Sequence, residues 1–140
     1  MSADTNTTTA PAESQNANPY DPGYLRGKVA IVTGSGAGIG KAIAEALFAE
    51  GALVMCNSRS DSSQQVAVTL DPEGKRASFF KGDLSQDATC RQLVKHTIDT
   101  FGRLDILVNN AGKNHPVPHT DLEGVTEDAL RGVFEINTFG

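Results

Sequence analysis

Four glycines lie within seven residues of this sequence, at Gly34, Gly36, Gly38 and Gly40. A β-branched, apolar run at 29–32 precedes them and favours a buried strand. Helical spacing follows the loop, in the small and apolar residues Ile39, Ala42, Ile43, Ala46 and Leu47. Glycine lets the backbone approach a ligand, and a helix N-terminus offers free N–H groups and a positive dipole end. This order suits a phosphate or pyrophosphate; the alternative is a tight strand-to-helix turn without a ligand.

Polar and glycine residues also follow two later apolar runs, where strands are expected to end. Asp83 comes after the run at 77–80, and Asn109-Asn110-Ala111-Gly112 comes directly after the run at 104–108. Ligands bind at the carboxyl ends of the strands in open parallel sheets. We therefore expect both segments to lie beside the glycine loop. The alternatives are a loop aspartate ahead of a helix and an ordinary turn.

The end of the second expected strand bears on which dinucleotide the chain prefers. NAD-binding proteins place an acidic residue about 20 positions after the glycines, whereas NADP-binding proteins use a basic residue for the 2′-phosphate. Here Ser58 occupies the acidic position and Arg59 follows it. Because a guanidinium can chelate a phosphate, the pair favours NADP over NAD. Asp61 lies a little further on and complicates this assignment, and the alternative for Arg59 is a solvated loop charge.

Asn137 stands on an apolar helical face. Leu130, Val133, Phe134 and Asn137 fall at positions i, i+3, i+4 and i+7 of the last expected helix. An amide on a buried face needs a hydrogen-bond partner, which could be a backbone kink, a water or a catalytic group. The alternative is an asparagine that faces solvent near the end of the helix.

These residues need elements that hold them in place, and strand-like and helix-like segments alternate along the chain. Strands are expected at 29–32, 53–56, 77–80 and 104–108, and helices from the glycine loop to Gly51, at 60–70, over 85–101 and from 127. The alternation predicts an α/β, Rossmann-type, doubly wound parallel sheet of order 3-2-1-4 between two helical layers. Residues 25–140 are expected to form this domain. Residues 1–24 are predicted to be a disordered polar tail.

The composition indicates which classes of partner and which cellular location to expect. Three of the 17 acidic residues and none of the 12 basic residues lie in the tail, so the remainder carries a net charge of −2. Without a basic patch or a long apolar run, neither nucleic acid nor a membrane is expected as a partner. Cys56 and Cys90 are interpreted as core residues, which favours a cytoplasmic location. Prolines around His115 and His119 place both in a loop, so no metal site is expected.

Two motifs together resemble the short-chain dehydrogenase/reductase family. Thr33, Gly34, Gly38 and Gly40 match T-G-x-x-x-G-x-G, residues 109–112 match N-N-A-G, and the resemblance extends from Gly27 to Gly140. The family transfers hydride between a nicotinamide cofactor and a carbonyl or alcohol substrate. The resemblance implies that Asn137 belongs to the catalytic tetrad. It implies cofactor binding by Gly34, Ser35, Gly36, Gly38, Ile39, Gly40, Ser58, Arg59, Asp83, Leu84, Asn110, Ala111 and Gly112.

The catalytic Ser, Tyr and Lys of the family have no counterparts here. The only Y-x-x-x-K spelling is Tyr24 with Lys28, which precedes the glycine loop and is interpreted as accidental. The sequence is therefore expected to be the N-terminal half of a longer oxidoreductase. This longer protein, the parent, is expected to be a homo-oligomer. Alone, the N-terminal half is expected to be inactive and weakly stable, because the fourth strand becomes an apolar edge and the last helix lacks its packing partners. The alternative is a short protein that binds a dinucleotide or a partner without catalysis.

Overall fold

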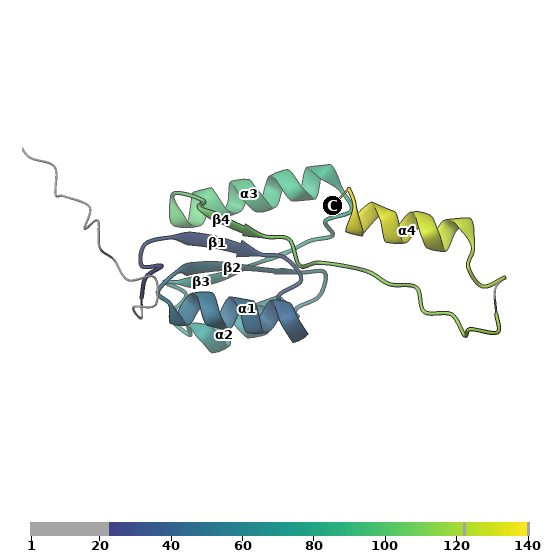
Figure 1. Cartoon of the computed structure of the whole chain (residues 1–140). Helices are drawn as coiled ribbons and strands as arrows, with labels where there is room; N and C mark the ends of the chain where they lie inside the picture. The colour runs from purple at the N-terminus through teal and green to yellow at the C-terminus, as the bar shows by residue number, and fades with distance from the viewer. Residues whose placement is uncertain (1–22, 122, 140) are drawn as a thin grey trace, which may run out of the picture.

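A computed structural model describes residues 23–121 and 123–139, in which strands and helices alternate (Figure 1). The strands are β1 (Val29–Val32), β2 (Leu53–Ser58), β3 (Ala77–Lys81) and β4 (Ile106–Val108), and the helices are α1 (Gly38–Ala49), α2 (Ser62–Leu70), α3 (Asp87–Phe101) and α4 (Glu127–Asn137). Most of the predicted tail lies outside the described residues. Its last two residues, Gly23 and Tyr24, belong to a turn that leads into β1.

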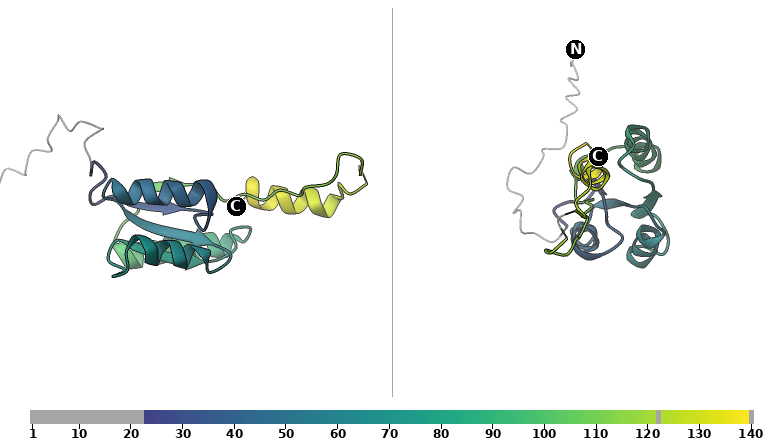
Figure 2. Two further views of the ribbon diagram at one scale, coloured as in Figure 1. Left: turned by 90° about the horizontal axis from the view of Figure 1, so that it is seen from below. Right: turned by 90° about the vertical axis from the view of Figure 1, so that its right-hand side faces the viewer.

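The four strands form one parallel sheet with the order β3-β2-β1-β4. Helices α1 and α2 cover one face and α3 covers the other, as the end-on view in Figure 2 shows. This is the predicted three-layer, Rossmann-type arrangement, and the predicted strand order is confirmed. Helix α4 does not cover the sheet. It projects beyond the edge at which the strands end (Figure 1).

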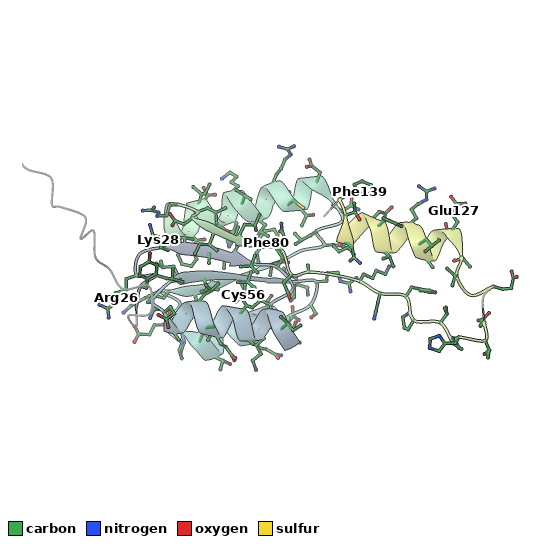
Figure 3. The ribbon with its side chains drawn as sticks, in the orientation of Figure 1. Arg26, Lys28, Cys56, Phe80, Glu127 and Phe139 are labelled. Carbon is green, nitrogen blue, oxygen red and sulfur yellow. The ribbon has the colours of Figure 1, made fainter. Side chains whose placement is uncertain are left out.

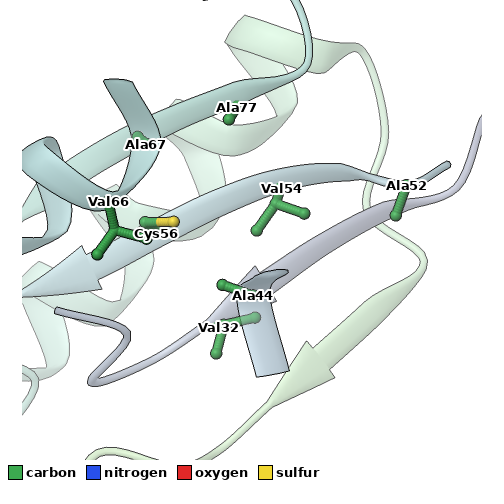
Figure 4. Close-up of a cluster of buried hydrophobic side chains, with 8 residues drawn as sticks. All are labelled: Val32, Ala44, Ala52, Val54, Cys56, Val66, Ala67 and Ala77. Atoms are coloured by element: carbon green, nitrogen blue, oxygen red, sulfur yellow. The ribbon is translucent and has the colours of Figure 1, made fainter. Parts of the chain in front are cut away.

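The core has two parts because the central strands are buried on both faces, as in other parallel sheets. Val32, Val54 and Cys56 point towards α1 and α2 and form one cluster with small residues of those helices (Figure 4). Ile31 and Met55 point the other way and pack with Leu93 of α3 and with Leu84, which precedes that helix. The sheet and three helices therefore form a rigid support for the loops at the strand ends.

In two helices, apolar residues at helical spacing are exposed. Ile39 does not join the buried face of α1, because its side chain is 75% exposed, while Ala44 is fully buried. In α4 the apolar face is exposed, with Leu130 47% and Phe134 56% accessible, as expected for a helix that lacks its packing partners. The cause is the position of α4, which lies beyond the sheet, so that no other described element covers its apolar stripe.

None of the helices in residues 23–121 and 123–139 combines the length and the apolar character needed to cross a membrane.

Candidate functional site

The glycine loop between β1 and α1 is fastened to the ends of two neighbouring strands. Ser35 is fully buried; its backbone N–H donates to the Asn57 carbonyl over 2.9 Å, and its hydroxyl accepts from the Asn57 N–H over 2.9 Å. The Asn57 side chain in turn donates to the Phe80 carbonyl over 3.0 Å. One buried serine and one buried asparagine thus tie the loop to β2 and β3.

The segment Asn109–Gly112 fastens the loop from the other side. The hydroxyl of Thr33 accepts from the backbone N–H groups of Asn110 and Ala111, each over 2.9 Å. The Asn110 amide donates to the carbonyls of Thr33, over 2.9 Å, and of Gly34, over 3.3 Å. The two sequence motifs are therefore one hydrogen-bonded unit, although 75 residues separate Thr33 from Val108, whose carbonyl also accepts from the Thr33 hydroxyl.

Two glycines of the loop are required by this close packing. Gly34 has a φ of +64°, and a methyl group there would lie 2.9 Å from the Ala111 Cα. A methyl group at Gly40 would collide with the Gly34 carbonyl and the Asn110 amide. Gly38 also has a positive φ, +55°, but faces open space. The loop, the start of α1 and the Asn109–Gly112 segment can touch only because side chains are absent at 34 and 40.

A pocket of about 460 Å³ opens at the ends of the strands, beside this unit. Seven of the predicted cofactor residues line it: Gly34, Gly36, Ser58, Arg59, Leu84, Ala111 and Gly112. The remaining six, Ser35, Gly38, Ile39, Gly40, Asp83 and Asn110, do not. Of these, Ser35 and Asn110 fix the loop by hydrogen bonds, and Gly40 allows α1 to pack closely against it. The pocket has the size of a small-molecule site.

The charges around the pocket favour an anion. Arg59 and Lys113 line it, and within the described parts of the chain no carboxylate does. The nearby Asp61 pairs with Lys81 over 2.8 Å. The pKa of Asp83 is lowered, chiefly by the hydrogen bond from the Ser85 backbone and also by the charges of Arg59 and Lys113. The pocket therefore has an electropositive wall that would complement phosphate groups.

Helices α1 and α2 both begin at this pocket. They differ in whether a side chain accepts a hydrogen bond from their first N–H groups. Helix α1 starts after Ala37 without a side-chain cap and without an acidic residue in its first turn. At α2, the Ser58 hydroxyl accepts from the Ser63 N–H over 3.1 Å and from the Ser62 hydroxyl over 3.2 Å. The N-terminus of α1 is thus open to an anionic ligand, whereas the Ser58 hydroxyl already accepts a hydrogen bond from the N-terminal turn of α2.

Asn137 does find a hydrogen-bond partner, but on an exposed part of the molecule. Its side-chain oxygen accepts from the Lys113 N–H over 2.8 Å, and its side-chain nitrogen donates to the Lys113 carbonyl over 2.9 Å. These bonds join the end of α4 to the residue that follows Gly112. The partner is therefore the backbone of a neighbouring segment, which was not among the candidates that the sequence suggested.

The remaining candidates lie away from the pocket. Tyr24 and Lys28 precede β1 at the opposite end of the sheet, where Figure 3 labels Lys28 far from Phe139 and Glu127 of α4. His115 lies in the irregular segment after β4 and His119 in a turn of that segment. Among the described residues, no three His, Cys, Asp or Glu side chains gather as a metal site would require.

Several pocket residues were not predicted from the sequence. Asn57, Ser60, Ser62 and Lys113 all line the pocket. Asn57 carried a usable signal, because an amide at the end of an apolar strand is buried only when it has partners. Lys113 carried none, since its place depends on the path of the chain after β4.

Comparisons with known proteins agree with this geometry. The family model described as short chain dehydrogenase matches residues 28–140. The short chain dehydrogenase/reductase nsrJ of Aspergillus novofumigatus is 41% identical over 124 residues, which cover 87% of this chain and 46% of that protein. The crystal structure of 3-ketoacyl-(acyl-carrier-protein) reductase from Brucella melitensis complexed with NADH superposes with a TM-score of 0.73 at 32% identity, over 81% of this chain and 46% of that one.

The extent of the matches differs among relatives. The chain spans 44–46% of the length of five curated relatives that are 38–42% identical to it. In contrast, it covers 94% of the short-chain dehydrogenase/reductase homolog YusS of Bacillus subtilis, which is 40% identical over 103 residues. With the family model matching most of the chain and with the parallel sheet, the glycine loop and the Asn109–Gly112 segment in place, the chain belongs to the short-chain dehydrogenase/reductase family.

Proposed function

We propose that this chain is the dinucleotide-binding half of an oxidoreductase that interconverts a carbonyl and an alcohol, with NADP preferred over NAD. The observation that supports it most is the pocket at the strand ends, which joins the glycine loop, two cations and no carboxylate of the described residues. The bound nicotinamide would supply hydride transfer. The chain's own residues bind the dinucleotide, orient it and exclude water from one side of it.

Each part of the pocket suits one part of a dinucleotide. The backbone at Gly34 and Gly36 and the uncapped start of α1 would hold the pyrophosphate. Asp83 and Leu84, after β3, would meet the adenine. Ala111 and Gly112, after β4, would lie at the nicotinamide end. This assignment follows the order of the strands, since β3 and β4 are the two outer strands and the glycine loop follows β1, which lies between β2 and β4.

The preference for NADP rests on the surroundings of Arg59. Arg59 lines the pocket with Ser60 and Ser62, and Asp61, which could otherwise bind ribose hydroxyls, is paired with Lys81. A 2′-phosphate would therefore meet a cation and hydroxyl donors. The NADH complex is a property of the structural relative. The preference for NADP is proposed for this chain from its own residues.

For Asn137 we propose the role that the family resemblance implies, which is to hold a water in a proton relay. The two bonds to the Lys113 backbone support it, because they fix Asn137 next to Gly112, at the nicotinamide end of the pocket. The Ser, Tyr and Lys that would position the carbonyl and carry its proton would come from a longer parent chain. The 140-residue chain is accordingly proposed to bind cofactor without turnover.

The test is a fluorescence titration of the 140-residue chain with NADPH and with NADH. We expect NADPH to bind about tenfold more tightly, which corresponds to one charge-assisted hydrogen bond. Arg59→Gln should remove that difference and leave NADH binding unchanged. Arg91→Gln, which removes the same charge from an exposed position on α3, is the matched control. Tighter binding of NADH would assign NAD as the cofactor, and binding of neither would refute the proposed function.

A second candidate is a short protein that binds a dinucleotide, or pairs with a relative, without catalysing a reaction. It is favoured by the near-complete coverage of the Bacillus subtilis homolog YusS. The intact mass of the native gene product separates the two. A mass far above 14.7 kDa supports the enzyme half, and carbonyl reduction by the parent is then measured. A mass of 14.7 kDa supports the short protein. The cytoplasmic location and the homo-oligomeric parent stay predictions.

A further inference from the structure

A second cavity lies beside the dinucleotide pocket, at the base of the projecting part of the molecule. Figure 1 shows the segment after β4 running away from the sheet and α4 returning beside it. Between them is a cavity of about 340 Å³, whose apolar wall comes from Val125, Ala129, Leu130 and Val133. This volume is at the lower end of the range of small-molecule sites.

Lys113 is the one residue of the described chain that lines both cavities. Its backbone is fixed by the two hydrogen bonds to Asn137. Its ammonium group lies against α4 at Gly132, where an added methyl group would be 3.0 Å from the Lys113 Nζ. Glycine within a helix is less favourable than alanine. Here it provides the space that the ammonium occupies.

Lys113 is not paired with a carboxylate of the described residues, although its charge contributes to the lowered pKa of Asp83. It forms no ion pair with any Asp or Glu in residues 23–121 and 123–139. No carboxylate from these residues lines the second cavity either; its other polar residues, Asn114, His115 and Asn137, offer hydrogen-bond donors. An apolar cavity with one cation and several donors at its rim suits a molecule that has an apolar body and an anionic head.

We infer that the second cavity is a substrate subsite for amphiphilic anions, with Lys113 as the residue that selects for their negative group. The apolar body of the substrate lies along α4, and its carboxylate or other acidic head meets the ammonium of Lys113. This inference rests on the proposed function, because Gly112 next to Lys113 is assigned there to the nicotinamide end. It adds the chemical class of substrate.

The test compares three six-carbon probes, hexanoate, 1-hexanol and hexylamine, with the ¹⁵N-labelled 140-residue chain in the absence of nucleotide. Chemical-shift changes are followed by two-dimensional NMR. We expect hexanoate to shift the signals of residues 113–115 and 129–133. It should bind about three- to fivefold more tightly than 1-hexanol, as one partly exposed ion pair allows, and hexylamine should bind more weakly than 1-hexanol.

Two variants and a control test whether Lys113 causes the preference for hexanoate over 1-hexanol. Lys113→Gln should equalise hexanoate and 1-hexanol without changing the affinity for 1-hexanol. Gly132→Ala keeps the charge but displaces the ammonium, and should reduce the preference. Lys75→Gln, which removes an exposed charge near the start of β3 at the other end of the sheet, is the control and should change neither affinity. Their NMR spectra also report whether each variant is folded.

Equal binding of hexanoate and 1-hexanol to the unmodified chain would overturn the inference, and so would hexanoate shifts confined to Gly34–Gly40. An equal effect of Lys75→Gln and Lys113→Gln would overturn it too, because the preference would then reflect net charge alone. A titration with NADPH on the same sample separates this failure from that of the proposed function. Dinucleotide binding without a hexanoate preference refutes only the subsite. A sample that binds no dinucleotide refutes the proposed function, and with it the substrate class.

Discussion

At the scale of single residues, Thr33 joins the two motifs of the site. Its hydroxyl accepts two backbone N–H groups and its side chain is only 4% exposed. Thr33→Val keeps the shape but leaves both donors without their partner, so we expect a loss of about 2–3 kcal/mol of unfolding free energy. Urea denaturation measures it, and NADPH affinity should fall in parallel because the loop loses its anchor.

Thr97→Val is the matched control for this prediction. Thr97 is also buried, but its hydroxyl only donates to the Leu93 carbonyl of its own helix, over 2.8 Å. That carbonyl keeps its helical partner, so the expected loss is below about 1 kcal/mol. Equal losses for the two variants would mean that the hydroxyl of Thr33 does not hold the Asn109–Gly112 segment.

The residues of the site were only partly predictable from the sequence. The glycines and Asn110–Gly112 could be found because their types are unusual next to apolar strands. The sequence could not show which of these residues line the pocket and which hold the loop in place. Ser35 and Asn110 direct their polar atoms to the backbone and away from the pocket. Lys113 was missed because a lysine in an irregular segment has no pattern that reveals its neighbours.

At the scale of elements, Arg76 stabilises the end of a helix that it does not belong to. Its guanidinium donates to the carbonyls of Phe48, over 2.6 Å, and Ala52, over 3.2 Å, and lies 4.1 Å from the Phe48 ring centre. These contacts hold the end of α1 to the start of β3. Arg76→Met should therefore cost about 2 kcal/mol in urea denaturation.

The comparison variant for Arg76 is Arg131→Met. Arg131 pairs with Glu127 within the exposed helix α4, over 2.7 Å. Such a pair contributes about 0.5 kcal/mol or less. A loss as small as this for Arg76→Met would show that the end of α1 does not depend on the guanidinium.

Asp105 joins the start of β4 to the start of β1 and makes this junction sensitive to acid. The Arg103 guanidinium and the Val29 N–H, at 2.8 Å, hold the pKa of Asp105 below its usual range. A carboxyl whose pKa is lower in the folded chain stabilises the fold above about pH 4 and loses this contribution as the pH falls below that value. The urea midpoint should thus fall between pH 5 and 3 by more for the unmodified chain than for Asp105→Asn. Parallel profiles would contradict this role.

The elements themselves were more predictable than their burial. Strands β1 to β3 and the helices follow from periodicity and from the glycines that end them. The apolar stripe of α4 was real, yet periodicity shows only that a face is apolar and cannot show what covers it. Leu130 and Phe134 are exposed because α4 stands beyond the sheet.

At the scale of the whole molecule, apolar surface gathers where β4 and α4 have no neighbours among the described elements. β4 forms one edge of the sheet, and its Leu107 is 54% exposed. An apolar strand edge without a charge, proline or bulge can pair with another chain. We therefore expect the 140-residue chain to associate with itself as its concentration rises, as seen by sedimentation velocity.

Leu107→Lys tests whether the association uses this edge. A lysine on an edge strand opposes pairing, and at an exposed position it should change the unfolding free energy by less than about 0.5 kcal/mol. The variant should sediment as a monomer at concentrations where the unmodified chain associates. Val68→Lys places the same charge on α2, at a side chain that is 53% exposed and distant from β4, and should leave association unchanged. If both lysines act alike, the association depends on overall charge and the open edge of β4 plays no part in it.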